Sequence, residues 1–488
     1  MNTSTEFSGQ PKPSAQDASP DSARPTADAG KDAQRQQGNR RTAPTTRTRR
    51  AGNLRATLYR MHSWAGILVA PFLVLAALTG LAYAIAPTLE QMVYRDVLTT
   101  EATGEHISAA EAIDIAREVH PDLELAGVQV NDREDATMRV LFLDPALPSS
   151  SYKQAVFIDP VSGEVLGDMP QYGSSSSLPL RALLSEGHAN LWLGEPGRFY
   201  SEMAASWLGA MTLTGAFLLF QRWRRSTSKK NKPRRWHSLV GLLCIPGFLF
   251  LTVTGLTWSS TSGGTIGEIR TQLDWRRPTP DVTATAPLSA GAQSEDAPAD
   301  AAAAGDAGAD AAIAAAREAG LTGFLTATAP TEPEAPDVWT VAESTAQPWV
   351  FSYDAVAINA ATGEVVDTVP FSSWSLPAKL SEWLIRAHMG ILLGLLNQLV
   401  LVGLAVGLLA SIVLGYIMWW RRGKGSSFGR LPAPRSWENV SRPALICFLL
   451  ILVVYGIFAP YFGLSVLAFV AIDATYRAFR RRRPRQLH

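Results

Sequence analysis

The chain of 488 residues has only two cysteines, Cys244 and Cys447, and both lie inside apolar stretches. Two such cysteines exclude a disulfide framework and a cysteine-rich zinc or iron–sulfur site. The motif Cys-x-x-Cys-His is absent, so covalent attachment of a c-type haem is also excluded. No Gly-x-Gly-x-x-Gly motif follows a predicted strand, which argues against a nicotinamide or flavin dinucleotide site.

Charged side chains are scarce as well, at 18% of residues against 47% hydrophobic ones. They crowd into some segments and are missing from others, a distribution typical of membrane proteins. The net charge of +1 gives no indication of a nucleic-acid partner. Residues 1–54 are polar and contain almost no large apolar side chains, so we expect a disordered tail without a cleavable signal peptide.

Long apolar runs predict a mainly α membrane protein with about six transmembrane helices. Four runs are long enough to span a bilayer: 55–90, 199–223, 237–260 and 386–420. A further apolar region at 443–474 is too long for one upright span and contains Pro460, so we expect a tight helical hairpin there.

The basic residues predict the orientation, because cytoplasmic segments of membrane proteins collect Lys and Arg. The basic clusters lie in the N-terminal tail, the loops 224–236 and 421–442, and the C-terminal tail 475–488. All four reach one side only if the number of spans is even. We therefore expect a multi-pass protein of a bacterial plasma membrane, with both termini cytoplasmic and the segments 91–198 and 261–385 outside.

The two outer segments resemble each other at an offset of 200 residues. "AIDIAREV" at 112–119 aligns with "AIAAAREA" at 312–319, and a Gly-Glu-Val turn follows each at Gly163 and Gly363. Helical spacing followed by strand patterns predicts a small α+β unit in each segment. In the second unit, an Ala/Asp-rich run over about 288–311 is interpreted as a flexible insertion.

Histidines recur with their surroundings in the apolar runs. His237 lies 175 residues after His62, and Thr79-Gly80-Leu81 recurs as Thr254-Gly255-Leu256 at the same offset. His188 and His388 are related by the offset of 200, and each closes an outer segment. The order span, outer unit, histidine, span therefore occurs twice, which predicts a duplicated helical bundle.

This ordered set resembles the PepSY-associated transmembrane proteins, which include iron-regulated membrane proteins and ferric-siderophore reductases. The resemblance covers most of residues 55–425. It rests on the His-x-x-x-Gly span start, the Gly-Glu-Val strand pair, the second histidine and the span ending in Trp-Arg-Arg. The Ala/Asp-rich run of the second outer unit departs from the family pattern.

One histidine at a membrane boundary often only caps a helix, but two symmetric pairs favour a function. Neutral imidazoles on facing helices can hold a b-type haem, whereas zinc alone would need a third or fourth ligand. We expect two haem b groups, one held by His62 with His237 near the cytoplasmic face and one by His188 with His388 near the outer face. Two such groups would carry electrons across the membrane.

The family resemblance implies a ferric siderophore as the outer electron acceptor, and membrane lipids surround the spans. The donor would be a cytoplasmic component or a membrane quinol, because the cytoplasmic loops are too short for a dinucleotide domain. Two alternatives stay open at this point: a non-enzymatic membrane sensor or anchor that binds peptides or proteases, and a transporter. A haem absorption spectrum separates both from a reductase.

Overall fold

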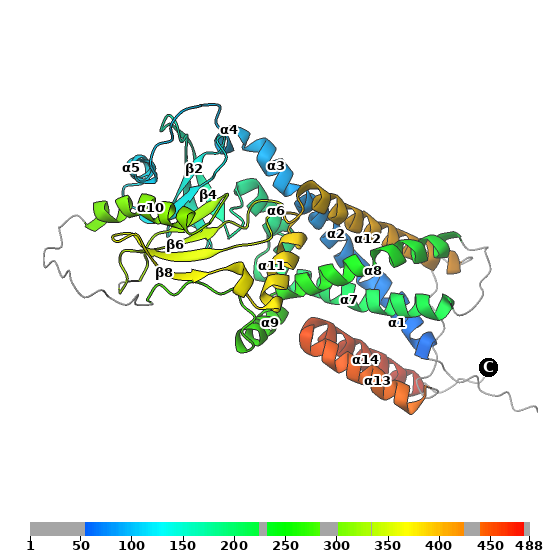
Figure 1. Cartoon of the computed structure of the whole chain (residues 1–488). Helices are drawn as coiled ribbons and strands as arrows, with labels where there is room; N and C mark the ends of the chain where they lie inside the picture. The colour runs from blue at the N-terminus through cyan, green and yellow to red at the C-terminus, as the bar shows by residue number, and fades with distance from the viewer. Residues whose placement is uncertain (1–53, 224–231, 284–300, 333, 424–439, 483–488) are drawn as a thin grey trace, which may run out of the picture. The chain divides into compact units, whose positions relative to one another are not determined.

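The computed structural model describes residues 54–223, 232–283, 301–332, 334–423 and 440–482, and these belong to one compact unit. They form a bundle of long helices and a β-sheet covered by shorter helices (Figure 1). The predicted N-terminal tail lies outside the described residues, as do parts of the two basic loops and the last residues of the chain.

Three described helices are long and apolar enough to cross a membrane: α7 (Glu195–Trp223), α8 (Lys232–Thr257) and α12 (Gly394–Arg422). A fourth span results if α1 (Leu54–Leu68) and α2 (Ala70–Ala84) are counted together. These two helices are bent by 60° at their junction, and Pro71 lies in the first turn of α2. Proline lacks the N–H that would continue the helical hydrogen bonds, which explains a bend at this place.

The predicted hairpin consists of α13 (Arg442–Phe458) and α14 (Pro460–Arg482), which pack against each other. The apolar parts of both are shorter than a full span. The described residues thus contain three or four candidate spans and a pair of shorter apolar helices, against the six spans expected. Pro460 ends α13, because its ring cannot continue the preceding helix.

The long helices share a core of small and medium apolar side chains. It contains Ala65, Val69, Leu73, Ala77, Ala204, Leu208, Cys244, Phe248 and Leu408, from α1, α2, α7, α8 and α12. Gly247 allows α8 and α12 to approach closely, since a Cβ atom there would lie 2.2 Å from Leu404 Cδ2. Close packing of small residues is the usual way in which membrane helices associate.

The two predicted α+β units form one continuous antiparallel sheet of eight strands. The strands are β1 (Glu124–Val130), β2 (Met138–Leu143), β3 (Tyr152–Ile158), β4 (Val165–Tyr172), β5 (Leu325–Thr328), β6 (Val338–Glu343), β7 (Ala355–Asn359) and β8 (Glu364–Val369). Their order is β4-β3-β2-β1-β5-β6-β7-β8. Each predicted unit supplies four consecutive strands, and the two sets meet where β1 pairs with β5.

Gly127 makes this β1–β5 junction possible. Its φ of 149° departs from the strand conformation of other residues, and the register of β1 on β2 shifts beside it. A Cβ atom at Gly127 would lie 2.2 Å from the carbonyl oxygen of Ala327. Only glycine lets the two backbones approach this closely.

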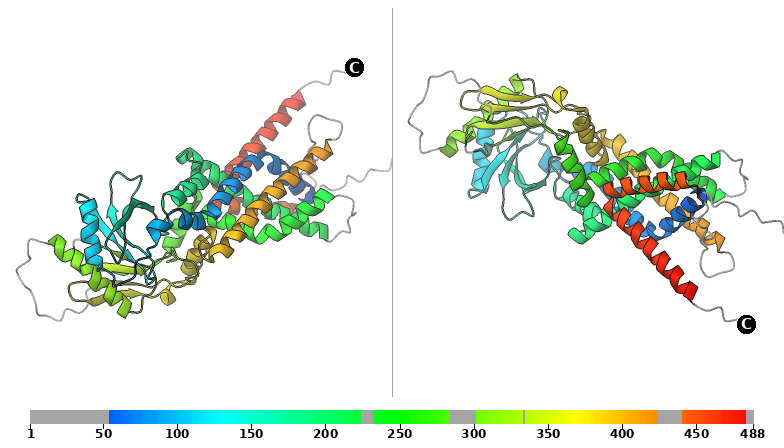
Figure 2. Two further views of the ribbon diagram at one scale, coloured as in Figure 1. Left: turned by 90° about the horizontal axis from the view of Figure 1, so that it is seen from above. Right: turned by 90° about the horizontal axis from the view of Figure 1, so that it is seen from below.

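Helices cover both faces of the sheet. The helices α5 (Ala109–Val119) and α10 (Ala301–Glu318) pack on one face and on each other (Figure 2). Alternate strand residues such as Phe142 point to these helices, while Leu141 and Phe157 belong to a cluster on the other face. The other short helices are α3 (Ala86–Val93), α4 (Arg95–Leu98), α6 (Pro179–Asn190), α9 (Thr261–Gln272), η1 (Phe371–Ser373) and α11 (Leu376–His388).

The Ala/Asp-rich run was expected to be flexible, but its last part, 301–311, is helical. Helix α10 begins at Ala301, and residues 284–300 lie outside the described part of the chain. Asp310 of this helix accepts hydrogen bonds from the backbone N–H groups of Ala109 and Ala110 at the start of α5. The run is helical here because alanine favours the helix. Asp310 in turn caps the N-terminus of the neighbouring helix α5.

Candidate functional site

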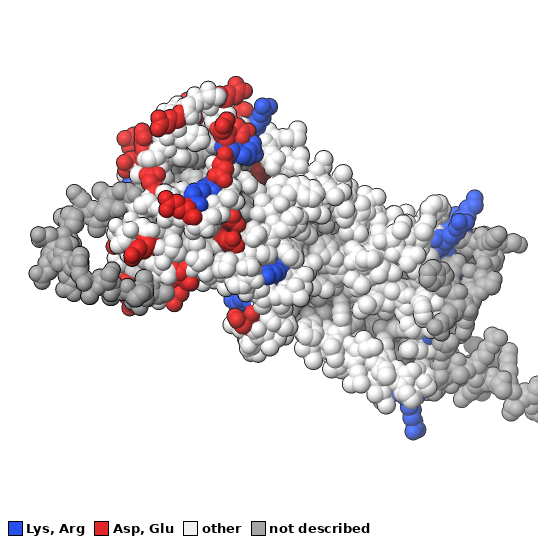
Figure 3. Space-filling view, viewed as in Figure 1, with Lys and Arg blue, Asp and Glu red and all other residues white. Residues whose placement is uncertain are grey.

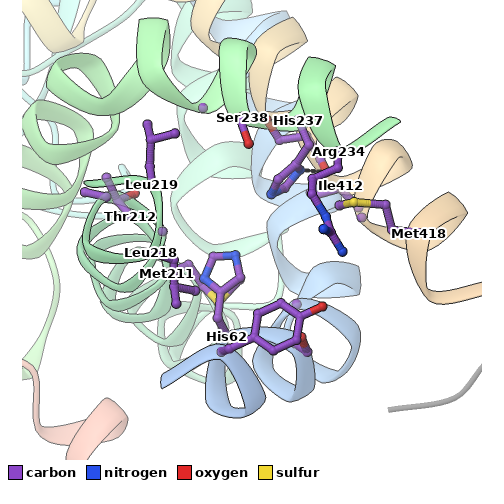
Figure 4. Close-up of a pocket in the computed structure, with 18 of the residues that line it drawn as sticks. His62, Met211, Thr212, Leu218, Leu219, Arg234, His237, Ser238, Ile412 and Met418 are labelled. Carbon is purple, nitrogen blue, oxygen red and sulfur yellow. Dashed lines mark hydrogen bonds between the residues drawn. The ribbon is translucent and has the colours of Figure 1, made fainter. Parts of the chain in front are cut away.

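The first histidine pair lies between two long helices. His62 comes from α1 and His237 from α8, and their ring centroids are 6.3 Å apart with the ring planes at 75°. Both rings point into the space between these helices (Figure 4). The two residues stand 175 positions apart in the sequence, so the pair depends on the packing of the bundle.

The second pair lies where the sheet part joins the long helices. His188 is near the end of α6 and His388 is the last residue of α11, and their ring centroids are also 6.3 Å apart, at 37°. The short helix α6 packs on α2, and α11 packs on α8. The structure therefore brings together the same two pairs that the sequence analysis grouped.

Each of the four rings is held through its Nδ1 atom. Nδ1 contacts Thr214 Oγ1 in His62 at 3.0 Å, Thr79 Oγ1 in His188 at 3.1 Å, Thr254 Oγ1 in His388 at 2.6 Å, and the Ser411 carbonyl oxygen in His237 at 3.0 Å. The partner always comes from a different helix. The rings are thus fixed in orientation by the bundle, not by their own helices.

These contacts bear on which ring nitrogen carries the proton. Each threonine hydroxyl donates its own proton to the carbonyl one turn earlier in its helix: Thr79 to Leu75, Thr214 to Ala210 and Thr254 to Phe250. A hydroxyl has a single proton, so toward histidine it can only accept. The Ser411 carbonyl can only accept as well. The His237 ring is therefore an Nδ1–H tautomer with an unprotonated Nε2, and the other three rings take the same form when their threonines donate along the helix.

An unprotonated Nε2 is the form in which imidazole binds a metal. Metal-ligating histidines usually donate the other ring N–H to a neighbouring acceptor, which fixes the ring and strengthens the ligand. The contacts of the four rings with Thr214, Thr79, Thr254 and the Ser411 carbonyl all use Nδ1. Each histidine is thus arranged as a metal ligand would be.

The distance between the two rings of each pair fits two imidazole ligands bound to one metal ion. An imidazole nitrogen lies about 2 Å from the metal that it binds, so two nitrogens on opposite sides of one ion are about 4 Å apart. The ring centres lie further out, behind each nitrogen. A centroid separation of 6.3 Å is therefore wide enough for one metal ion between the rings of each pair.

Each pair offers only two protein nitrogens. Among the described residues, no group of three or more His, Cys, Asp or Glu side chains could hold a metal ion. A structural zinc site uses four protein ligands, whereas haem iron takes only its axial ligands from the protein. The donor set of each pair thus fits haem iron better than a bare zinc ion.

A cavity of about 770 Å³ adjoins His62 and His237. This volume is within the range of about 300–1,000 Å³ that is usual for cofactor and ligand sites. Its walls are mostly apolar and include Phe248, Leu408 and Ile412. The cavity also reaches basic residues near helix ends: Arg55, Arg234, Arg421 and Arg422.

Four of the helices that line this cavity contribute a glycine, and the missing side chains enlarge it. These residues are Gly66 of α1, Gly215 of α7, Gly241 of α8 and Gly415 of α12. A Cβ atom at Gly241 or Gly415 would meet no atom within 4 Å. A Cβ atom at Gly215 would lie 3.3 Å from His62 Cε1, so that glycine also admits the ring. Smooth helix faces around two available nitrogens suit a flat macrocycle.

Aromatic rings and a glycine surround the second pair. Tyr83 stacks on His188 at 6.2 Å with the planes at 8°, and Trp258 meets His388 edge-on at 5.6 Å. His188 Cε1 lies 3.0 Å from the Cβ position of Gly80, so a larger residue there would displace the ring. Burial lowers the pKa of His188 to about 4 and that of His388 to about 3, so both rings are neutral at pH 7.

The two pairs are separated by most of a membrane-spanning helix. On α8, His237 belongs to the first pair and Thr254 supports the second, 17 residues later. At 1.5 Å per residue this is about 25 Å along the helix axis. The hydrocarbon core of a bilayer is about 30 Å thick, so the pairs lie near its two sides if α8 crosses it upright.

The groups that orient the histidines were not predicted from the sequence. Thr79 and Thr254 belong to the repeated Thr-Gly-Leu motif, but the motif alone indicated no role for them. The repeat itself was the available signal for these two. Thr214 belongs to no repeated motif. The Ser411 partner is a backbone oxygen, which every residue has, so the sequence cannot single it out.

Comparison with known protein families gives a match over most of the chain. Residues 59–422 match the family described as PepSY-associated TM region. The matched segment contains all four histidines and both sets of strands. Among curated proteins, no sequence matches the chain.

Proposed function

The chain belongs to the PepSY-associated TM region family, and from that membership we propose that it is a haem-containing electron-transfer protein of a bacterial plasma membrane. One observation carries the proposal. Four histidines from two distant places in the bundle form two pairs, and each is held through Nδ1 so that Nε2 is available. A capping or purely structural role does not require this common tautomer.

His62 with His237 would hold one haem b, and His188 with His388 would hold a second. Haem supplies reversible one-electron chemistry at its iron. The chain's own residues would do the rest. Thr79, Thr214, Thr254 and the Ser411 carbonyl keep the ligand nitrogens unprotonated and the rings in place.

We further propose that the chain is a duplicated bundle of six spans, with α13 and α14 as the last two. The basic residues of the helix ends near His62 and His237 support a cytoplasmic position for that pair. The sheet and the second pair then lie outside. Figure 3 supports this division, because acidic side chains gather over the sheet while the face of the long helices carries almost no charge.

In this orientation electrons would pass outward, from a cytoplasmic or quinol donor to an acceptor beside the sheet. The family resemblance suggests a ferric siderophore as that acceptor, which would make the protein a ferric reductase for iron uptake. Ferric iron is held tightly by hard oxygen ligands, and one added electron gives ferrous iron, which such a chelate holds less well. The iron is then released from the chelate.

The absorption spectrum of the purified protein tests the proposal. We expect a red protein with a Soret band that shifts on reduction by dithionite. The rival function, a membrane sensor or anchor that binds peptides or proteases, predicts a colourless protein. Absence of the Soret band after expression with added haem precursor would therefore favour the sensor over the reductase.

A further inference from the structure

A second cavity, of about 700 Å³, lies between the sheet and the long helices. Its walls come from the turn between β1 and β2, from β2, α3 and α6, and from two loops that contain Trp349 and Ile391. It shares no residue with the cavity beside His62 and His237. Three arginines line it, Arg133, Arg139 and Arg181, against one carboxylate, that of Glu90.

Two of these charges neutralise each other. Glu90 and Arg181 are both buried and form an ion pair at 3.3 Å. Glu90 also accepts a hydrogen bond from the backbone N–H of Leu178, and Arg181 donates to Ser177 Oγ at 2.7 Å. This pair is satisfied by the protein itself. Arg133 is likewise paired, with Asp135 at the surface.

Arg139 differs from the other two because no carboxylate within the described residues forms an ion pair with it. One of its NH groups donates to Gln171 Oε1 at 3.1 Å, and its Nε is buried without a hydrogen-bond partner. The guanidinium lies 5.2 Å from the ring centroids of Phe157 and Phe324. Burial lowers the pKa of Arg139 to about 10, so it stays charged at pH 7.

Arg139 is partly buried, and its buried Nε–H without an acceptor is costly unless a ligand satisfies it. Lys and Arg are scarce in the surrounding part of the chain, so an arginine in this cavity is unusual for the region. Residues 101–175 contain only Arg117, Arg133, Arg139 and Lys153 as Lys or Arg, and residues 325–369 contain none. Acidic side chains dominate the surface of the sheet part (Figure 3). Two of these four basic residues, Arg133 and Arg139, line the cavity.

We propose that this cavity binds a small organic anion and that the Arg139 guanidinium pairs with its carboxylate or phosphate group. The planar fork of arginine matches both groups with two parallel hydrogen bonds. The exposed Trp349 offers apolar surface to the rest of such a ligand, and the buried Phe324 also lines the cavity. The cavity volume is that of a small-molecule site. The proposal does not depend on haem.

The test uses the full-length protein in detergent, with citrate and inorganic phosphate as probes and titration calorimetry as the measurement. We expect saturable binding of at least one probe, weakened about tenfold or more in Arg139→Gln. Lys153→Gln is the matched control, because Lys153 is on the neighbouring strand and does not line the cavity. It removes the same charge from the same sheet and should bind like wild type. Arg139→Lys should recover part of the affinity.

A lipid headgroup is the other source of the same chemistry. If neither soluble probe binds, the protein is placed in nanodiscs with and without phosphatidylglycerol. Retention of that lipid by wild type and Lys153→Gln, but not by Arg139→Gln, would support the anion site with a lipid as its ligand. The proposal is overturned if no anion binds saturably, or if Lys153→Gln weakens binding as much as Arg139→Gln. Equal melting temperatures of the two variants ensure that misfolding does not produce the difference.

Discussion

Threonine hydroxyls determine the chemistry of three of the four histidines. A hydroxyl that already donates to its own helix can only accept from the imidazole, so it selects the tautomer as well as the orientation. The fourth histidine reaches the same state through a backbone carbonyl. Different partners thus produce one protonation state, which favours a shared role for the four rings.

Replacing Thr254 by valine tests this role. Valine keeps the shape of threonine but cannot accept the Nδ1–H of His388, which leaves a buried donor unpaired. Loss of such an outer partner typically weakens metal binding by about 10- to 100-fold. We expect Thr254→Val to lose haem from the second pair to apomyoglobin faster than wild type does, measured by the decay of its Soret band.

Thr257→Val is the control for this change. Thr257 lies on the same helix, is exposed, and donates only to the Val253 carbonyl. It should retain haem like wild type. Equal haem loss in the two variants would show that the contact between Thr254 and His388 has no special role.

The cavity beside His62 depends on small residues, which gives a second prediction at this scale. Gly241→Leu adds four carbon atoms to a wall where a Cβ now meets nothing within 4 Å. We expect this variant to lose the haem of the first pair and to keep the other, as measured by pyridine haemochrome content. Gly403→Leu should keep both, because Gly403 is exposed on α12 and does not line the cavity.

At the scale of elements, the junction between β1 and β5 joins two sets of four strands into one sheet. Gly127→Val would place a side chain 2.2 Å from a backbone oxygen and impose a conformation that valine avoids. We expect a loss of about 2 kcal/mol or more in the free energy of unfolding. A lower melting temperature of the purified protein would show it.

Gly264→Ala provides the comparison for this change. Gly264 is exposed on α9, and a Cβ atom there meets nothing within 4 Å. Alanine favours helix over glycine, so the melting temperature should be unchanged or slightly higher. If Gly127→Val melts like Gly264→Ala, the junction is not close enough to require glycine.

Local patterns predicted most elements and missed how they join. The helices around His62 and His237 follow from apolar runs, and the strands from alternation before Gly163 and Gly363. The β1–β5 pairing connects strands about 200 residues apart, and no local pattern encodes such a contact. The helical start of α10 was missed because an Ala/Asp-rich composition is compatible with both a linker and a helix.

The candidate site was predictable to a similar extent. A repeat of His62 and His188 with their surroundings identified all four histidines and their grouping. The repeat could not identify Thr214 or the Ser411 carbonyl, whose roles arise only when α7 and α12 pack against the histidine helices. Nor could it identify Arg139, which has no counterpart in the repeat.

At the scale of the whole molecule, the orientation in the membrane decides the direction of any electron transfer. Thr362→Cys, in the exposed turn between β7 and β8, should react with a membrane-impermeant maleimide in intact cells. Arg235→Cys, at the exposed start of α8, should react only after permeabilisation. Both are made in a Cys447→Ser background, because Cys447 is exposed and Cys244 is buried. The reverse labelling pattern would place the sheet inside the cell.

The central claim is that each histidine pair holds one haem. The most direct measurement is the pyridine haemochrome content of the purified wild-type protein, of His62→Ala/His237→Ala and of His188→Ala/His388→Ala. We predict two haems per chain in wild type and one in each double variant, with the retained haem low-spin and bound by two histidines. Unchanged haem content in both double variants, or no haem in wild type, would contradict the claim. If a third variant, His62→Ala/His388→Ala, loses one haem while each of the other two double variants loses both, the pairing is wrong.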